Sequence, residues 1–312
     1  WLAPRLWRHL EPAHTRPLLP SLPWEQPHVL ASGRVPVQNL TPGWSATSLG
    51  NPAASRYPAC WQSLPRSPWD LALFDGRLYV GLGNSSNQGA SANAGPSPLF
   101  AYNFQQQRWR QEASLPEEQI SRFLIAGDQL WIAGEDPRDS WRWGNLYRRK
   151  SQERFWWQQR RLPRFIHAHD LALYQGRLVV AGNVSDAVAH GAQQDRHGSA
   201  LAISVDDGKT WSVKRMFGWR ATTLLPFSGS LFAVEALPGP QLKRWLQQGQ
   251  RWRPWVAVHQ WQAEIGWKPR PAIKAENLLP GMQAASARSA WIDRATPNRQ
   301  GVAWIASSGP WG

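Results

Sequence analysis

The stretch from Leu71 to Gly81 reads LALFDGRLYVG, and its pattern decides the fold. An apolar run, a short turn that contains a glycine and a second apolar run follow one another, which is the pattern of a β-hairpin. It returns as FLIAGDQLWIA at residues 123–133, LALYQGRLVVA at 171–181 and LLPFSGSLFAV at 224–234. The leucines that anchor the second strands, Leu78, Leu130, Leu178 and Leu231, are 52, 48 and 53 residues apart. The pattern therefore indicates a strand-rich repeat.

Tryptophans near the end of each repeat have a similar period. Trp61, Trp109, Trp157, Trp211 and Trp252 are spaced by 48, 48, 54 and 41 residues. A period near 50 residues in a strand-rich chain is typical of a β-propeller, in which one repeat forms one four-stranded blade. We therefore predict an all-β chain, a β-propeller of four-stranded blades, with six blades favoured and seven as the alternative.

The predicted organisation is an arm followed by one propeller domain. Residues 1–27 contain six prolines and little alternation, which favours an extended N-terminal arm lying over the body. The propeller then fills 28–312, with blades at about 28–66, 67–118, 119–165, 166–219, 220–260 and 261–312. Within the last of these, the Lys268-Pro269-Arg270-Pro271 run favours a long insertion between strands over 262–287.

Residues 204–211 read SVDDGKTW, which fits Ser-x-Asp-x-Gly-x-Thr-Trp and resembles the Asp-box of BNR or sialidase-like β-propellers. The hairpins also resemble kelch repeats. The resemblance implies a structural hairpin, in which an aspartate accepts N–H groups of the turn, a glycine takes a positive φ and a tryptophan packs on the blade. The predicted structural residues are Ser204, Asp206, Gly208, Thr210 and Trp211. The resemblance concerns the fold, because the arginine triad and Tyr–Glu pair of sialidases have no recognisable counterpart here.

The chain is strongly basic and rich in tryptophan. It carries 35 basic against 21 acidic residues, a formal charge of +14, and 22 tryptophans. A positive, arginine-rich surface attracts acidic proteins, anionic glycans, anionic lipids or nucleic acid. The single cysteine, Cys60, excludes an intrachain disulfide and a cysteine-based zinc site. No apolar run approaches 18 residues, so we expect no membrane-spanning helix.

Arginines and tryptophans interleave over residues 138–164. This favours a basic and aromatic surface for an acidic partner, with a solvated blade edge as the alternative. Nucleic acid is the less favoured partner, because no recognised nucleic-acid-binding module is present. The predicted surface comprises Arg142, Arg148, Arg149, Arg154, Trp156, Arg160 and Arg161.

The main candidate polar site lies around His167 and His169, which alternate on one face of a predicted first strand. Asp170 follows them, and Asp70 holds the matching place eight residues before the anchor leucine of an earlier repeat. We expect these four residues near the mouth of the central channel. Hydrogen bonding to backbone between blades is the favoured role, so no metal site is predicted; the histidines are the candidate ligands if one exists, and proton transfer is a further alternative. Long loops at 83–96 and 182–198 indicate either one enlarged binding face or tolerated flexible insertions.

The preferred functional hypothesis is a non-enzymatic propeller that acts as a scaffold, assembly or accessory subunit and binds an acidic protein partner in a larger complex. A carbohydrate-binding or carbohydrate-active propeller at the cell surface is the first alternative, and a metal-dependent enzyme using His167 and His169 is the second. An anionic glycan or membrane surface is an alternative partner, and no cofactor is expected. The start at Trp1 rather than Met is expected of a processed or truncated chain, and a removed signal peptide, as one explanation, favours a secreted, periplasmic or lumenal location.

Overall fold

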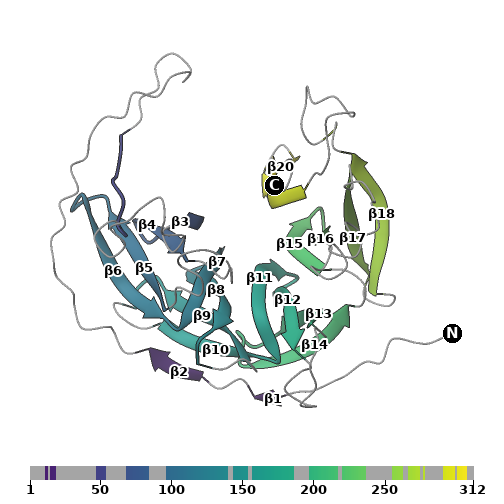
Figure 1. The fold of residues 1–312 in the computed structure, drawn as a ribbon, viewed down its shortest axis with the longest axis horizontal. Helices are drawn as coiled ribbons and strands as arrows, with labels where there is room; N and C mark the ends of the chain where they lie inside the picture. The colour runs from purple at the N-terminus through teal and green to yellow at the C-terminus, as the bar shows by residue number, and fades with distance from the viewer. Residues whose placement is uncertain are drawn as a thin grey trace, which may run out of the picture.

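In a computed structural model, the described residues form antiparallel sheets fanned around a common centre (Figure 1). The structure describes residues 11–12, 15–18, 47–53, 68–83, 96–139, 143–153, 157–185, 197–216, 220–236, 255–262, 266–274, 277, 291–298 and 301–307. Among these residues, no helix is both long and apolar enough to cross a lipid bilayer.

Four repeats each contribute four antiparallel strands in simple up-and-down order, and one strand pairing joins the second and third sets into a larger sheet. The first comprises β3 (Pro68–Phe74), β4 (Arg77–Leu82), β5 (Ser97–Asn103) and β6 (Arg108–Leu115). The second comprises β7 (Glu117–Ala126), β8 (Gln129–Pro137), β9 (Trp143–Lys150) and β10 (Trp157–Pro163). The third comprises β11 (Phe165–Tyr174), β12 (Arg177–Ser185), β13 (His197–Ser204) and β14 (Thr210–Met216). The fourth comprises β15 (Arg220–Phe227), β16 (Ser230–Ala236), β17 (Trp255–Gln262) and β18 (Gly266–Lys274).

The sheets are the blades of a β-propeller, which confirms the predicted fold class. The first strands of successive blades, β3, β7, β11 and β15, pack side by side. A further hairpin, β19 (Trp291–Asn298) with β20 (Gly301–Ser307), packs against β15. Residues 28–46 and 54–66 of the predicted first blade lie outside the described residues, so the number of blades stays a prediction. We call the four complete sheets blades A, B, C and D in chain order.

The repeated hairpins form as their sequence predicts. In blade A the turn residues Asp75 and Gly76 have φ angles of 50° and 69°, and in blade C Gln175 and Gly176 have 49° and 70°. Two successive positive φ angles define the turn that suits the twist of a hairpin, and glycine adopts them without steric cost. The anchor Leu130 in blade B is fully buried.

The boundary of blade D differs from the prediction. β18 covers Lys268 to Pro271, which had been placed in an insertion, and pairs antiparallel with β17. Blade D therefore reaches Lys274 rather than residue 260. Prolines are tolerated here because β18 is the outermost strand of its sheet, and an edge strand can lack N–H groups on its open side.

The N-terminal segment adds strands to two blades. β1 (Glu11–Pro12) pairs with β14 of blade C, and β2 (Thr15–Leu18) pairs with β10 of blade B. Both partners are outermost strands, which would otherwise present open backbone groups. The described part of the predicted arm therefore lies along the outer edges of blades B and C.

Hydrogen bonds within the turn stabilise the hairpin at 204–211. Asp206 accepts hydrogen bonds from the Thr210 N–H at 2.9 Å and the Thr210 hydroxyl at 2.6 Å. Ser204 Oγ accepts the Gly208 N–H at 2.8 Å, and Gly208 has a φ of 72°. Trp211 is fully buried in the core between blades B and C. These contacts give the motif a structural role.

Candidate metal centre

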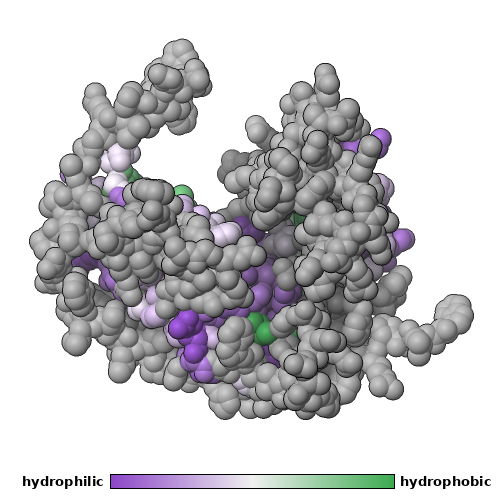
Figure 2. All heavy atoms as spheres, in the orientation of Figure 1, coloured by the Kyte–Doolittle hydropathy of each residue, from purple (hydrophilic) through white to green (hydrophobic). Residues whose placement is uncertain are grey.

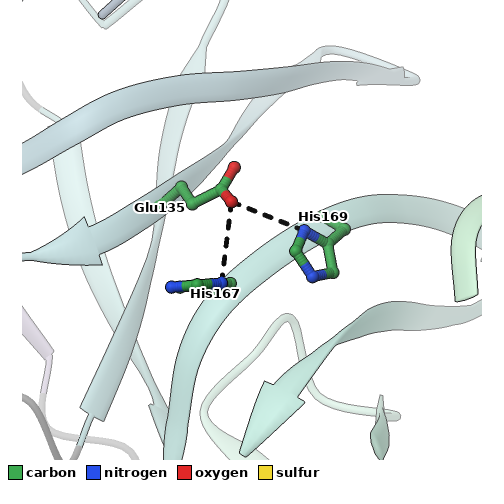
Figure 3. A group of neighbouring side chains, drawn as sticks. All are labelled: Glu135, His167 and His169. Atoms are coloured by element: carbon green, nitrogen blue, oxygen red, sulfur yellow. Dashed lines mark ion pairs between the residues drawn. The ribbon is translucent and has the colours of Figure 1, made fainter. Parts of the chain in front are cut away.

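Two histidines and a glutamate meet where blades B and C touch. His167 and His169 lie on β11, the first strand of blade C, and Glu135 lies near the end of β8 in blade B. The pair His167–Glu135 is the point at which β11 pairs with β8. Figure 3 shows both imidazoles turned toward the same carboxylate. We call Glu135, His167 and His169 the His–Glu cluster.

The distances in the His–Glu cluster suit a bound cation. The Oε1 atom of Glu135 lies 3.7 Å from Nδ1 of His167 and 3.6 Å from Nδ1 of His169 (Figure 3). Ligand atoms placed about 2.1 Å from a tetrahedral zinc ion stand about 3.4 Å apart. One ligand atom from each of the three residues lies within 4.8 Å of the other two, so the cluster is compact enough for all three to reach one ion.

Neighbouring side chains hold the carboxylate and one imidazole in place. Ser121 Oγ and Gln119 Nε2 donate hydrogen bonds to Glu135 Oε2 at 2.5 and 3.0 Å, so that Oε1 faces the histidines. Asp136 Oδ1 lies 2.6 Å from Nε2 of His167. A carboxylate at this distance favours the tautomer with a proton on Nε2, which leaves the Nδ1 lone pair for a metal. The φ of Asp136 is 57°, an uncommon angle for a residue other than glycine.

The surroundings of the His–Glu cluster are acidic, although the chain as a whole is basic. Glu118, Glu135 and Asp136 have exposed fractions of 2%, 9% and 5%. Burial, followed by repulsion from Asp136, raises the pKa of Glu118, while the ion pair with Arg138 opposes the rise. Buried carboxylates are costly unless a cation compensates them. Figure 2 shows hydrophilic residues gathered near the centre of the molecule, around β11.

Solvent reaches the His–Glu cluster. The side chains of His167 and His169 are 25% and 11% exposed. Three protein ligands with access to water leave one coordination position open, as in catalytic rather than structural zinc sites. The cluster also lies at the end of β8, on the face where the second strands of the blades end. The two long loops begin on that face, although residues 84–95 and 186–196 lie outside the described residues.

Asp70 and Asp170, the other two predicted site residues, lie elsewhere. Asp170 accepts hydrogen bonds from the N–H groups of Leu171 and Leu224, both at 2.8 Å, and Leu224 belongs to blade D. Asp70 makes the matching pair of bonds, to Leu71 in its own blade and to Phe123 in blade B, also at 2.8 Å. These carboxylates link the first strands of neighbouring blades, which is the structural alternative predicted for them.

Glu135 and Asp136 were missed from the sequence. A signal was available in the repeat, because Glu135 stands five residues after the anchor Leu130. The matching places hold Gly83, Asn183 and Ala236. An acidic residue at this place breaks the repeat.

The predicted basic partner surface is wrong for three of its arginines. Arg148, Arg149 and Arg160 are only 7%, 2% and 2% exposed, because they lie between blades. Arg149 pairs with Glu112 of blade A at 2.8 Å, and Arg160 donates to the carbonyl of Asp207 in blade C at 3.0 Å. Arg161 is half-buried and pairs with Asp139 at 2.6 Å. Arg142, Arg154 and Trp156 lie outside the described residues.

A second buried carboxyl group, that of Glu117, lies at the start of β7. Its Oε1 atom accepts hydrogen bonds from the Tyr147 hydroxyl at 2.8 Å and from the Asn145 amide. Gln159 donates in turn to the Asn145 carbonyl oxygen at 2.7 Å. Burial raises the pKa of Glu117 well above its ordinary value, and the hydrogen bonds from Asn145 and Tyr147 oppose the rise.

Replacing Glu117 by glutamine is expected to remove a pH-dependent loss of stability. With its raised pKa, folded Glu117 keeps a proton at pH values where the unfolded chain, with a pKa near 4.5, has released it. The contribution of Glu117 to the free energy of unfolding therefore falls by up to about 1.4 kcal/mol for each pH unit above 4.5, until the folded carboxyl group ionises. Urea unfolding at pH 4.5 to 8 should show E117Q gaining on the wild type as pH rises. A pH-independent difference would contradict this assignment.

Comparisons with known proteins show similarity of fold alone. No protein-family model matches the chain, and no curated protein matches it. An α-L-arabinofuranosidase from Clostridium thermocellum is 13% identical over 76% of this chain and 87% of that chain, with a TM-score of 0.39. Hydrazine synthase from Kuenenia stuttgartiensis is 9% identical over 74% and 68%, with a TM-score of 0.42. The N-terminal domain of Nup159 is 8% identical over 65% and 48%, with a TM-score of 0.36. At these identities and scores the matches carry no argument about activity or partner.

Proposed function

We propose that this β-propeller is a metal-dependent protein that binds one divalent transition-metal ion through Glu135, His167 and His169. The observation that carries the proposal is the position of Glu135 Oε1, which Ser121 and Gln119 fix at ligand-like distances from two imidazole nitrogens. Two nitrogen donors and one oxygen donor favour zinc and its neighbours over calcium or magnesium, which prefer oxygen ligands alone.

The open coordination position supports an enzyme more than a structural site. A water molecule held there by zinc would have a pKa near neutrality and could act as a nucleophile in hydrolysis. Neighbouring side chains would orient this centre: Asp136 orients His167, and Ser121 and Gln119 orient Glu135. We therefore favour the metal-dependent enzyme over the scaffold that was the first hypothesis from the sequence.

Metal titration tests the proposal against simple ion pairing. Protein stripped with a chelator should bind one equivalent of Zn²⁺ with micromolar or tighter affinity by calorimetry, and Co²⁺ should give the visible absorption of a tetrahedral nitrogen–oxygen site. E135Q and H169Q should each weaken binding by at least about 100-fold. If protonated imidazoles merely pair with Glu135, neither metal will bind at one equivalent.

His259 provides the matched control for this titration. It is buried and pairs with Glu235 at 2.8 Å in blade D, so the pair offers one histidine and one carboxylate outside the His–Glu cluster. H259Q should therefore leave zinc affinity unchanged. An equal loss of affinity in H259Q and H169Q would show that the titration reports general stability and would remove the assignment.

Partner binding remains a second proposal, with a different surface from the one predicted. Leu73, Ile125 and Leu173 hold matching places on the first strands of blades A, B and C, with exposed fractions of 62%, 47% and 47%. A recurring row of exposed apolar side chains supports contact with another protein. Co-purification from the native source, with and without serine at these three places, would test it.

A further inference from the structure

A cavity of about 200 Å³ lies between blades C and D. Its walls come from the β11–β12 hairpin, from β13 and β14, and from β16 and β17 of blade D. The lining residues are Tyr174, Gln175, Arg177, Val179, Leu201, Ile203, Lys214, Leu231 and Trp261. A space of this size accommodates one aromatic ring with a small substituent, since engineered cavities of about 150 Å³ bind benzene.

The cavity exists because one repeat lacks an aromatic side chain. The residue that follows each anchor leucine faces the next blade, and in blades A and B it is Tyr79 and Trp131. The Tyr79 ring fills the space between blades A and B, with its centre 6.2 Å from that of Trp157 and 6.5 Å from that of Phe123. Val179 takes this place in blade C, and its side chain fills less of the matching volume than the Tyr79 ring does in blade A.

Blade A also has a carboxylate, Glu112, at the place that corresponds to this cavity, and the described lining of the cavity has none. In blade A, Arg77 forms an ion pair with Glu112, and the Tyr79 hydroxyl donates to Glu112 Oε2 at 3.1 Å. Arg177 is the counterpart of Arg77, since each residue precedes the anchor leucine and pairs with the last residue of the first strand. Glu112 lies in a bulge of β6.

The fourth strand of blade C has Val213 and Lys214 in the corresponding region. Among the described residues, the cavity lining includes two cations, Arg177 and Lys214, and no acidic side chain.

We infer that this cavity is a binding site for a small aromatic carboxylate. The ring would occupy the volume that Tyr79 fills in blade A, and the carboxylate would meet Arg177 as Glu112 meets Arg77. The planar guanidinium suits a carboxylate, and Val179, Leu201 and Ile203 provide apolar walls. Lys214 Nζ lies 4.6 Å from the centre of the Trp261 ring, which places a second positive charge at the wall. The inference is independent of the His–Glu cluster.

The test is calorimetric titration of the whole chain with benzoate and 4-hydroxyphenylacetate. A ligand of about ten non-hydrogen atoms should bind with a Kd of about 0.1–1 mM. Benzyl alcohol, which lacks the charge, and acetate, which lacks the ring, should bind at least about tenfold more weakly. R177Q changes an exposed side chain and should also weaken benzoate binding about tenfold. V179Y recreates the blade A residue and should abolish binding by filling the cavity.

Several results would overturn the inference. These are the absence of saturable benzoate binding up to about 20 mM, twentyfold above the weakest expected Kd, and equal binding of benzoate and benzyl alcohol. Unchanged affinity in R177Q would also overturn it, and this variant answers the question even if V179Y fails to fold. Because zinc does not enter the measurement, the outcome is separate from that of the metal titration.

Discussion

Replacing Asp170 by alanine is expected to lower the free energy of unfolding by about 3–5 kcal/mol. The Asp170 carboxylate accepts two backbone N–H groups, one of them from blade D, and pairs with Arg122 of blade B at 3.0 Å. It therefore connects three consecutive blades at their first strands. The alanine variant would leave the Arg122 charge buried without this carboxylate, at an exposed fraction of 7%.

The size of the expected loss follows from the burial of both partners. Burial raises the pKa of Asp170, although Arg122 and the two N–H groups oppose the rise. Desolvation of this ion pair therefore costs much of the free energy that its formation gains, so the intact pair stabilises the fold little more than a well-packed apolar pair would. Removing one partner is different, because the desolvation cost of the other remains without compensation.

Denaturant unfolding of the alanine and asparagine variants measures this effect. D170N keeps an oxygen that accepts one N–H group and should lose less stability than D170A. Asp128 is an exposed turn residue, so D128A is the control and should change stability by less than about 0.5 kcal/mol. A loss below about 1 kcal/mol in D170A would show that the blades do not depend on this link.

The hairpins and their register were predictable because their signals are local. The glycine turns, the anchor leucines such as Leu178 and the Asp-box tryptophan Trp211 depend on residues within one repeat. The His–Glu cluster depends on contacts between repeats. Glu135 and His167 are 32 residues apart in sequence and meet through the pairing of β8 with β11. Only the histidines, which lie on one strand, could be recognised together in advance.

The predicted exposure of the arginines in blade B was wrong for a related reason. A run of positive charge usually marks a solvated surface, and arginine is seldom fully buried unless it is paired. The partners of Arg149 and Arg160 lie in blades A and C, 37 and 47 residues away. The repeat places these guanidinium groups at the blade interfaces, where they replace part of the apolar packing.

Departures from the repeat locate both proposed sites. Glu135 stands where the other repeats have glycine, asparagine or alanine, and Val179 stands where blades A and B have aromatic residues. Residues that follow the repeat are constrained by the packing between blades, so few of them can also take part in binding a ligand. A residue that breaks the pattern at an interior position creates either an excess of charge or an unfilled volume. We propose that a cation compensates the first and that an aromatic anion fills the second.

Replacing Arg149 by methionine is expected to cost about 3 kcal/mol of stability, although the residue had been predicted on a partner-binding surface. Arg149 pairs with Glu112 at 2.8 Å and lies above the Tyr79 ring, with its guanidinium carbon 5.7 Å from the ring centre. Burial, followed by repulsion from Arg77, lowers the pKa of Arg149 to about 10. Glu112 is the nearest carboxylate to this charge, with Asp75 at 3.9 Å and the Glu153 carbonyl oxygen at 3.2 Å beside it. Loss of Arg149 therefore removes one of the two arginines that pair with Glu112, the other being Arg77.

A double-mutant cycle with E112Q separates this interaction from general packing. The two single variants should each be destabilised, and the double variant should recover part of the loss, giving a coupling energy of about 1.5–3 kcal/mol. R108M, at an exposed arginine of blade A, serves as the control and should be nearly neutral. A coupling below about 0.5 kcal/mol, together with unchanged stability of R149M, would contradict the buried pair.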